Sequence, residues 1–170
     1  KIAGDYWPYL NGPVSDDRPE TVIDRLTRAG VNLLILHEKW NKLQNFWEYA
    51  VSTREEITKL VKLCHSRGIR VLPYFGYEIT SPMPRFADLR DELTWMSEDG
   101  AGNYSGWYRV PYQRAHKVCY ASRWRDELAR GILKCIDDFD FDGVYLDTTT
   151  APMGCVNEKH GCGYRDGEGK

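Results

Sequence analysis

The chain has 170 residues, a length that suits one domain with a real hydrophobic core. Its formal net charge is -2, which excludes the global basic field that attracts nucleic acid. No apolar run approaches the ~20 residues that a membrane-spanning helix needs. We therefore expect neither nucleic acid nor a membrane among the partners.

One unit recurs along the sequence: an amphipathic helix, a short turn and then a hydrophobic strand. Gly30 and Gly68 end the first two helices, and Ser52 with Glu55 has the spacing of a capping box. The predicted helices span residues 18–30, 52–68 and 122–140, and the predicted strands that follow them span residues 31–37, 69–77 and 141–147. A first strand is expected within residues 1–12, so the chain contains nearly four βα units.

Repeated helix–turn–strand units with apolar strands predict parallel strands covered by helices. No Gly-rich phosphate loop follows any of these strands, which disfavours a nucleotide-binding sheet. We predict an α/β fold of parallel (β/α) units of the TIM-barrel type, the N-terminal half of a (β/α)8 barrel. Residues 1–170 would form one barrel domain or a fragment of one. Residues 78–121 form a long βα-loop insertion, with a helix over 84–96.

In parallel α/β folds the active site lies at the carboxyl ends of the strands. The predicted strands run into titratable residues there: His37 and Glu38 end one, Glu78 follows Tyr77 at the end of the next, and Asp147 ends the last. The candidate carboxylates are therefore Asp147, Glu78 and Glu38.

Asp147 is the strongest of these candidates. Side chains alternate along a strand, so Asp147 shares a face with Tyr145, while Val144 and Leu146 suit the layer beneath the helices. A carboxylate on the interior face is partly desolvated, so it needs a charged or hydrogen-bonding partner or marks a functional site. The alternative is an Asx turn that ends the strand through nearby backbone N–H groups.

Aromatic residues make up 13% of the chain, with six Trp and eleven Tyr. Such side chains fill cores, but they also line sugar-binding clefts. Trp7, Trp40 and Trp107 are candidate stacking residues, and His37 with Tyr145 would bind sugar hydroxyls. Core packing is the competing interpretation for the tryptophans, and a core-edge position competes for His37.

A loop rich in Gly, Cys and His follows Asp147. Cys155, His160 and Cys162 offer three zinc-type ligands, whereas a closed structural site needs four, so Cys119 or an acid would have to complete the set. The five cysteines are an odd number, which argues against a complete disulfide framework. A Cys155–Cys162 disulfide, reduced structural cysteines, a metal site and a substrate contact by His160 all remain open.

The segments "VCYASRWRDEL" and "DFDFDGVYLDTTTAPMGCVNEKHGCGYRDGEG" resemble glycoside-hydrolase-like (β/α)8 barrels. They are similar to bacterial proteins allied to glycoside hydrolase family 123 and, more distantly, to α-galactosidase and α-amylase type barrels. In those distant relatives a fourth strand similar to "DGVYLD" presents a catalytic Asp. The resemblance is specific over residues 118–168 and architectural before them. It implies that Asp147 is a nucleophile or transition-state stabiliser.

These observations predict a carbohydrate-active hydrolase that cleaves glycosidic bonds and uses neither a cofactor nor a metal. Its partners would be a carbohydrate substrate and the remainder of the barrel. A secreted or periplasmic location is expected. Two alternatives stay open: a non-catalytic carbohydrate-binding or scaffold barrel module, and a metal-dependent hydrolase built on His37, Asp147 and the Cys/His loop.

Overall fold

The computed structural model describes residues 2–6, 21–37, 40–41, 51–99, 104–105, 113–147 and 154–163, with the backbone alone at 2–6, 51–53 and 104–105. The chain divides into two compact units. Unit 1 contains the parallel strands, helices α2 and α3, and the part of α5 from Ile132 onward. Unit 2 contains the segment from Gly76 to Gly131 together with the chain from Asp147 onward.

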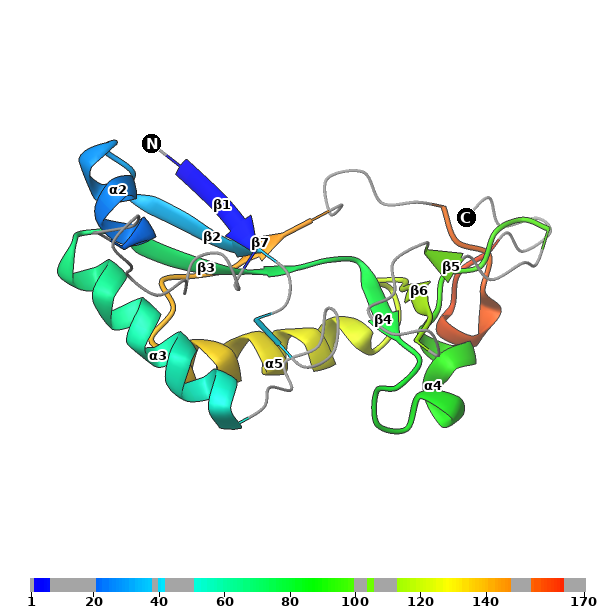
Figure 1. Ribbon diagram of the computed structural model, residues 1–170. Helices are drawn as coiled ribbons and strands as arrows, with labels where there is room; N and C mark the ends of the chain where they lie inside the picture. Colours follow the sequence, from blue (N-terminus) through cyan, green and yellow to red (C-terminus); the bar gives the residue numbers. More distant parts are fainter. Residues whose placement is uncertain are drawn as a thin grey trace. The chain divides into compact units, whose positions relative to one another are not determined.

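A parallel sheet forms the centre of unit 1. Its strands are β1 (Ile2–Tyr6), β2 (Leu33–His37), β3 (Arg70–Phe75) and β7 (Tyr145–Leu146), in the order β1-β2-β3-β7 (Figure 1). All three pairings are parallel. Each parallel strand therefore lies beside the one that precedes it in the chain, which is the arrangement of successive (β/α) units in a barrel. The predicted TIM-barrel type of fold is confirmed.

The helices are α2 (Val22–Arg28), α3 (Val51–Ser66) and α5 (Trp124–Phe139). Thr21 caps the first through its side chain, which accepts a hydrogen bond from the Asp24 N–H at 3.1 Å. Gly30 and Gly68 have φ values of 75° and 70°, which a glycine adopts without strain. The predicted glycine stops of both helices are confirmed.

The helix-facing side of the sheet forms the core of unit 1. Leu34 and Leu36 on β2 are fully buried, as is Val71 on β3. The predicted stripe of α3 is buried with them: Ile57, Leu60, Val61 and Cys64. Burying one such side chain contributes about 1.5–3 kcal/mol, so this layer is the main source of stability in unit 1.

The opposite face of the same strands is apolar but only partly covered. Leu33, Ile35 and Leu72 alternate with the fully buried residues and keep intermediate exposure. Strands that are apolar on both faces are typical of parallel sheets whose second face lies inside a barrel.

An acidic turn connects α5 to β7 and ties β7 to its neighbour. The Asp142 carboxylate accepts a hydrogen bond from the Val71 N–H at 2.8 Å, and His65 Nε2 lies 2.9 Å from the same oxygen. Gly143 packs against the Leu72 side chain, where a Cβ would lie 3.2 Å from Leu72 Cδ2. β7 itself has two residues instead of the predicted seven, because this turn occupies the residues before it.

Unit 2 contains a small antiparallel sheet that the sequence did not predict. Its strands are β4 (Glu78–Thr80), β5 (Tyr104–Ser105) and β6 (Ala115–Lys117), in the order β4-β6-β5 (Figure 1). Helix α4 (Phe86–Leu93), a 3-10 turn, η1 (Glu158–His160), and the first part of α5 lie in the same unit. Helix α4 is shorter than predicted because Thr94 leaves the helix to form a β-bridge with Val118. Among the described residues, no helix is long and apolar enough to cross a membrane.

Candidate functional site

Three aromatic rings form a row across the carboxyl ends of neighbouring parallel strands in unit 1. His37, the last residue of β2, has its ring centroid 4.5 Å from that of Tyr74 on β3. Tyr74 in turn stacks on Tyr145 of β7, with centroids 5.8 Å apart and ring planes 21° apart. Tyr74 and Tyr145 are partners in the strand register, so strand pairing brings the two rings together. The predicted position of His37 at the end of its strand is confirmed, and Tyr145 lies in β7, within the strand predicted over residues 141–147.

The outer ring of this row is open to solvent. Tyr145 is 39% exposed, while His37 and Tyr74 are half-buried. The sequence did not single out Tyr74, although its place four residues after Arg70 in an alternating strand puts it on the less buried face with Leu72.

Asp147 begins the second group of candidate residues, which lies in unit 2. It directly follows Leu146, the last residue of β7, and it is half-buried. Burial raises the pKa of the Tyr77 hydroxyl, and the negative charges of Glu78 and Asp147 raise it further. The two carboxylates therefore both lie near one phenol, which remains protonated at neutral pH and can donate a hydrogen bond.

Tyr120 is a member of this group that sequence reasoning missed. Burial raises the pKa of Tyr120 to about 12, and the charge of Asp147 contributes to the rise. Its hydroxyl is buried and has no hydrogen-bond partner among the described residues. A buried, unpaired hydroxyl near a carboxylate is unusual and suits a group that meets a ligand. Its place in the aromatic stretch "KVCYASRW" was the only signal in the sequence.

Glu78 differs from its predicted position at the tip of a parallel strand. β3 ends at Phe75, and Glu78 is the first residue of β4, where it pairs in register with Lys117. Its side chain is 3% exposed. The chain turns at Gly76 and Tyr77 and enters the antiparallel sheet, so the apolar run of residues 69–77 is not one strand.

Trp40 is a second correction, because the structure places it in the core instead of on a stacking surface. The side chain is 1% exposed, and its Nε1 donates a hydrogen bond to the Tyr74 carbonyl oxygen at 3.3 Å. Its ring packs edge-on against Phe75 and Phe141. A tryptophan with both faces covered has no face to offer a sugar. The other predicted residues Glu38, Trp7 and Trp107 lie outside the described residues.

The Cys/His loop forms the third group. The ligand atoms of Cys119, Cys155, His160 and Cys162 all lie within 4.8 Å of one another. Cys119 therefore supplies the fourth potential metal ligand, in addition to the three that lie close together in the sequence. Burial raises the pKa of the Cys119 thiol to about 12 and also raises that of Cys162. Such thiols are poor nucleophiles at neutral pH, which argues against a catalytic cysteine.

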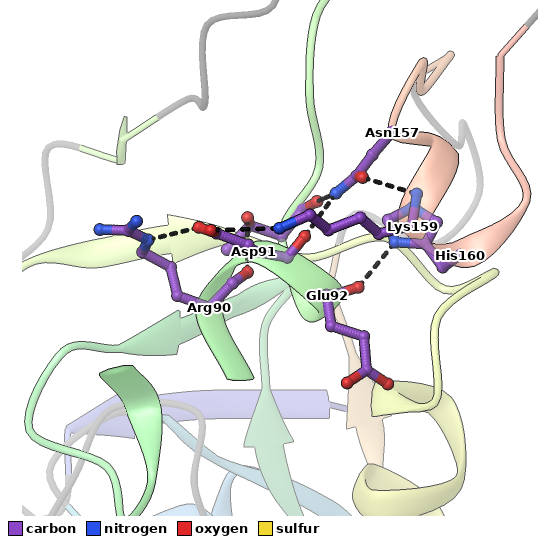
Figure 2. Close-up of polar contacts among 7 residues, drawn as sticks. Arg90, Asp91, Glu92, Asn157, Lys159 and His160 are labelled. Atoms are coloured by element: carbon purple, nitrogen blue, oxygen red, sulfur yellow. Dashed lines mark hydrogen bonds and ion pairs between the residues drawn. The ribbon is translucent and has the colours of Figure 1, made fainter. Parts of the chain in front are cut away.

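The structure argues against two of the interpretations that the sequence left open for this loop. His160 is not available to a substrate, because Nδ1 lies 2.7 Å from the Glu92 carbonyl oxygen (Figure 2). Its Nε2 lies 3.4 Å from Cys155 Sγ. All five cysteines are free, so Cys155 and Cys162 form no disulfide. Asn157 holds the loop in place by donating hydrogen bonds to the carbonyl oxygens of Asp91 and Thr94.

No family model and no curated protein matches the sequence, whereas many solved structures resemble the fold. The α-galactosidase from Thermus thermophilus, solved with p-nitrophenyl α-D-galactopyranoside, is 16% identical with a TM-score of 0.58, and the match covers 86% of this chain and 29% of that chain. A maltogenic α-amylase from Thermotoga neapolitana is 15% identical with a TM-score of 0.62, and the match covers 89% and 39% of the two chains.

A third structure extends the comparison to an amino sugar. The α-N-acetylgalactosaminidase of Bifidobacterium bifidum, solved with GalNAc, is 18% identical with a TM-score of 0.58, and the match covers 94% of this chain and 29% of that one. The chain thus spans roughly a third of the length of these enzymes. At these identities the likeness establishes a fold shared with glycosidase barrels.

Proposed function

We propose that this chain forms part of a carbohydrate-active hydrolase that cleaves glycosidic bonds, with Asp147 as the nucleophile or transition-state stabiliser. The observation that carries the proposal is the place of Asp147 directly after β7, the fourth parallel strand of the sheet. Carboxyl ends of parallel strands are where barrel enzymes build their active sites. The fold shared with an α-galactosidase, an α-amylase and an α-N-acetylgalactosaminidase supports this class of chemistry.

The surroundings of Asp147 support a chemical role over a simple turn. Glycoside hydrolysis uses two carboxyl groups. The negative charges of both Glu78 and Asp147 raise the pKa of the Tyr77 phenol. Tyr77 and Tyr120 stay protonated at neutral pH and are suited to donate hydrogen bonds to a carboxylate or a sugar hydroxyl. We therefore assign the second carboxyl group to Glu78, with Glu38 as the other candidate from the sequence.

Sugar binding is assigned to the aromatic row of unit 1. Tyr145 offers an exposed ring, and His37 adds a polar ring at the same strand-end level. Trp7 and Trp107 remain candidate stacking residues from the sequence. The alliance with glycoside hydrolase family 123 and the secreted or periplasmic location also remain predictions.

The metal-dependent alternative finds no support in the ligand geometry. The four ligand atoms of the Cys/His loop and Cys119 converge on one another, and neither His37 nor Asp147 belongs to that group among the described residues. A set of four protein ligands leaves no open position for a reacting water.

The test is glycoside turnover by the full-length protein that carries this sequence, measured on a panel of aryl α- and β-glycosides. Asp147→Asn keeps the size of the side chain and removes its charge, so we expect turnover to fall at least ~10²-fold. Asp137→Asn, a substitution at an exposed position on α5, is the matched control and should leave turnover unchanged. Unaltered turnover in Asp147→Asn would overturn the role of Asp147. Sugar binding without turnover in the parent protein would favour the non-catalytic module.

A further inference from the structure

We propose that Cys119, Cys155, His160 and Cys162 bind one zinc ion in a closed structural Cys3His site. The inference stands apart from the proposed glycosidase activity, because it rests on ligand geometry within unit 2 alone. The four ligand atoms lie within 4.8 Å of one another. Three thiolates and an imidazole are ligands that zinc prefers, and four of them complete its tetrahedral shell.

Two of the six distances between the ligand atoms are close to those that a zinc tetrahedron requires, and the whole set lies within 4.8 Å, from which small side-chain movements would close it around an ion. Zn–S and Zn–N bonds of ~2.3 and ~2.0–2.1 Å place two sulfurs about 3.8 Å apart and a sulfur and a nitrogen about 3.6 Å apart. Cys119 Sγ and Cys162 Sγ are 3.7 Å apart, and Cys155 Sγ and His160 Nε2 are 3.4 Å apart. Both edges agree with the tetrahedron to within about 0.2 Å, the tolerance expected of a metal site.

The histidine is held in the tautomer that a metal needs. His160 Nδ1 lies 2.7 Å from the Glu92 carbonyl oxygen, as the dashed line in Figure 2 shows. A carbonyl oxygen only accepts hydrogen bonds, so Nδ1 carries the proton and donates it. The neutral ring then has its lone pair on Nε2, the atom that faces Cys155. A backbone carbonyl that orients a ligating imidazole is the usual outer partner of a metal-binding histidine.

The two ligand-bearing segments meet at the carboxyl end of α4. Its last carbonyls have no partners within the helix, and the ligand segments supply donors to them. The Cys119 N–H donates to Leu93 O at 3.0 Å, His160 donates to Glu92 O, and Asn157 donates to Asp91 O at 2.8 Å. These bonds therefore place Cys119 and His160, together with Asn157, around one helix end.

The loop between the ligands is closed by its own backbone. The Cys162 N–H donates to Asn157 O at 3.2 Å, and the Asn157 side chain accepts from the Lys159 N–H at 3.1 Å (Figure 2). Gly161 has φ 80°, the left-handed region in which a glycine turns without strain. The loop thus presents His160 and Cys162 next to Cys155 in a short, tight turn.

A disulfide explains this arrangement less well than a metal. The 3.7 Å between the Cys119 and Cys162 sulfurs is far longer than an S–S bond of about 2.05 Å. A disulfide would use two of the three thiols and leave the third beside His160, whereas zinc uses every ligand. Binding replaces three thiol protons by one Zn²⁺, so the occupied site carries a net charge of -1.

The ion would connect two loops of the fold. Cys119 belongs to the segment between β3 and α5, and the other three ligands belong to the segment after β7. Cys119 and Cys162 are 43 residues apart in the chain. With all four positions taken by protein, the zinc has no place for a substrate, so its role is to hold these loops together.

The experiment measures metal in the full-length protein purified under reducing conditions without chelators. We expect about one zinc per chain by inductively coupled plasma mass spectrometry. His160→Ala and Cys155→Ser should each lower the zinc content at least ~10-fold. Cys135→Ala removes a buried cysteine of α5 outside the cluster and should leave the zinc content unchanged.

A second measurement uses only the parent protein, in case a ligand variant fails to fold. Co²⁺ added to the reduced, zinc-stripped protein should give the thiolate-to-cobalt charge-transfer band and visible ligand-field bands of a tetrahedral sulfur site. Zinc should then displace the cobalt and abolish the bands. Three results would overturn the proposal: no cobalt bands together with sub-stoichiometric zinc, a disulfide among these cysteines in the native protein, or stoichiometric iron in place of zinc.

Discussion

Asn157 holds the Cys/His loop against α4, and replacing it tests how much that attachment contributes to stability. The residue is 2% exposed, and its side-chain nitrogen donates to Asp91 O at 2.8 Å and Thr94 O at 3.0 Å. Its side-chain oxygen accepts from the Lys159 N–H at 3.1 Å. Asn157→Ala removes all three bonds. Asn157→Asp keeps the acceptor but loses both donors and directs a negative charge at two carbonyl oxygens.

The magnitude follows from these bonds. A hydrogen bond contributes about 0.5–1.5 kcal/mol net, and a buried acceptor left without a donor adds a further penalty. We expect Asn157→Ala to lower the free energy of unfolding by about 2–4 kcal/mol, and Asn157→Asp by at least as much. For a chain of this size that corresponds to a Tm lower by about 4–16 °C.

Differential scanning calorimetry measures the Tm, and hydrogen exchange locates the change. Exchange should accelerate at residues 91–94 and 157–162 and stay unchanged in β2 and β3, which belong to the other unit. Lys62→Gln, at an exposed position of α3 in unit 1, is the control and should shift the free energy of unfolding by no more than ~0.5 kcal/mol. If Asn157→Ala unfolds within ~0.5 kcal/mol of the parent protein, the loop is not held by these bonds and the reasoning fails.

Two further predictions concern the sheet of unit 1 and the acid stability of unit 2. Asp142→Ala should lower the free energy of unfolding, measured in urea, by about 1–2 kcal/mol, because it removes the acceptor of the Val71 N–H bond at 2.8 Å. Asp142→Asn keeps an acceptor and should lower that free energy by a smaller amount. Burial lowers the pKa of His116, aided by two neighbouring arginine charges, so the unfolded chain takes up a proton that the folded one does not. Stability should therefore fall as the pH drops below about 6.5, and His116→Gln should reduce that slope; an unchanged slope contradicts the assignment.

Much of unit 1 is readable from the sequence because its signals are local. Gly30 and Gly68 end helices through their own backbone conformation, and the stripe from Ile57 to Cys64 follows from helical periodicity. The place of Asp147 at the end of the fourth strand follows from the order of the units. The same local logic failed at Glu78, because an apolar run cannot show that the chain leaves one sheet after Phe75 and enters another.

The fourth ligand of the Cys/His loop shows a different limit. Cys155, His160 and Cys162 are recognisable as a group because they are close in the sequence, whereas Cys119 lies 43 residues before Cys162. Only the fold of the long segment after β3 brings Cys119 to the end of α4. Trp40 shows the same limit for a core residue. A tryptophan suits a sugar-binding surface, but packing against Phe75 and Phe141 leaves this one 1% exposed.

Asp147 lies in the chain between a strand that is paired in the sheet of unit 1 and a loop that is hydrogen-bonded to α4 in unit 2. Substitutions in the strand and in the loop therefore test its position separately. Before it, pairing of Tyr145 with Tyr74 and the Asp142 bond to Val71 set the register of β7. After it, Asn157 holds the Cys/His loop against α4. Because Asp142 and Asn157 are bonded to different units, their substitution separates the contribution of the strand from that of the loop.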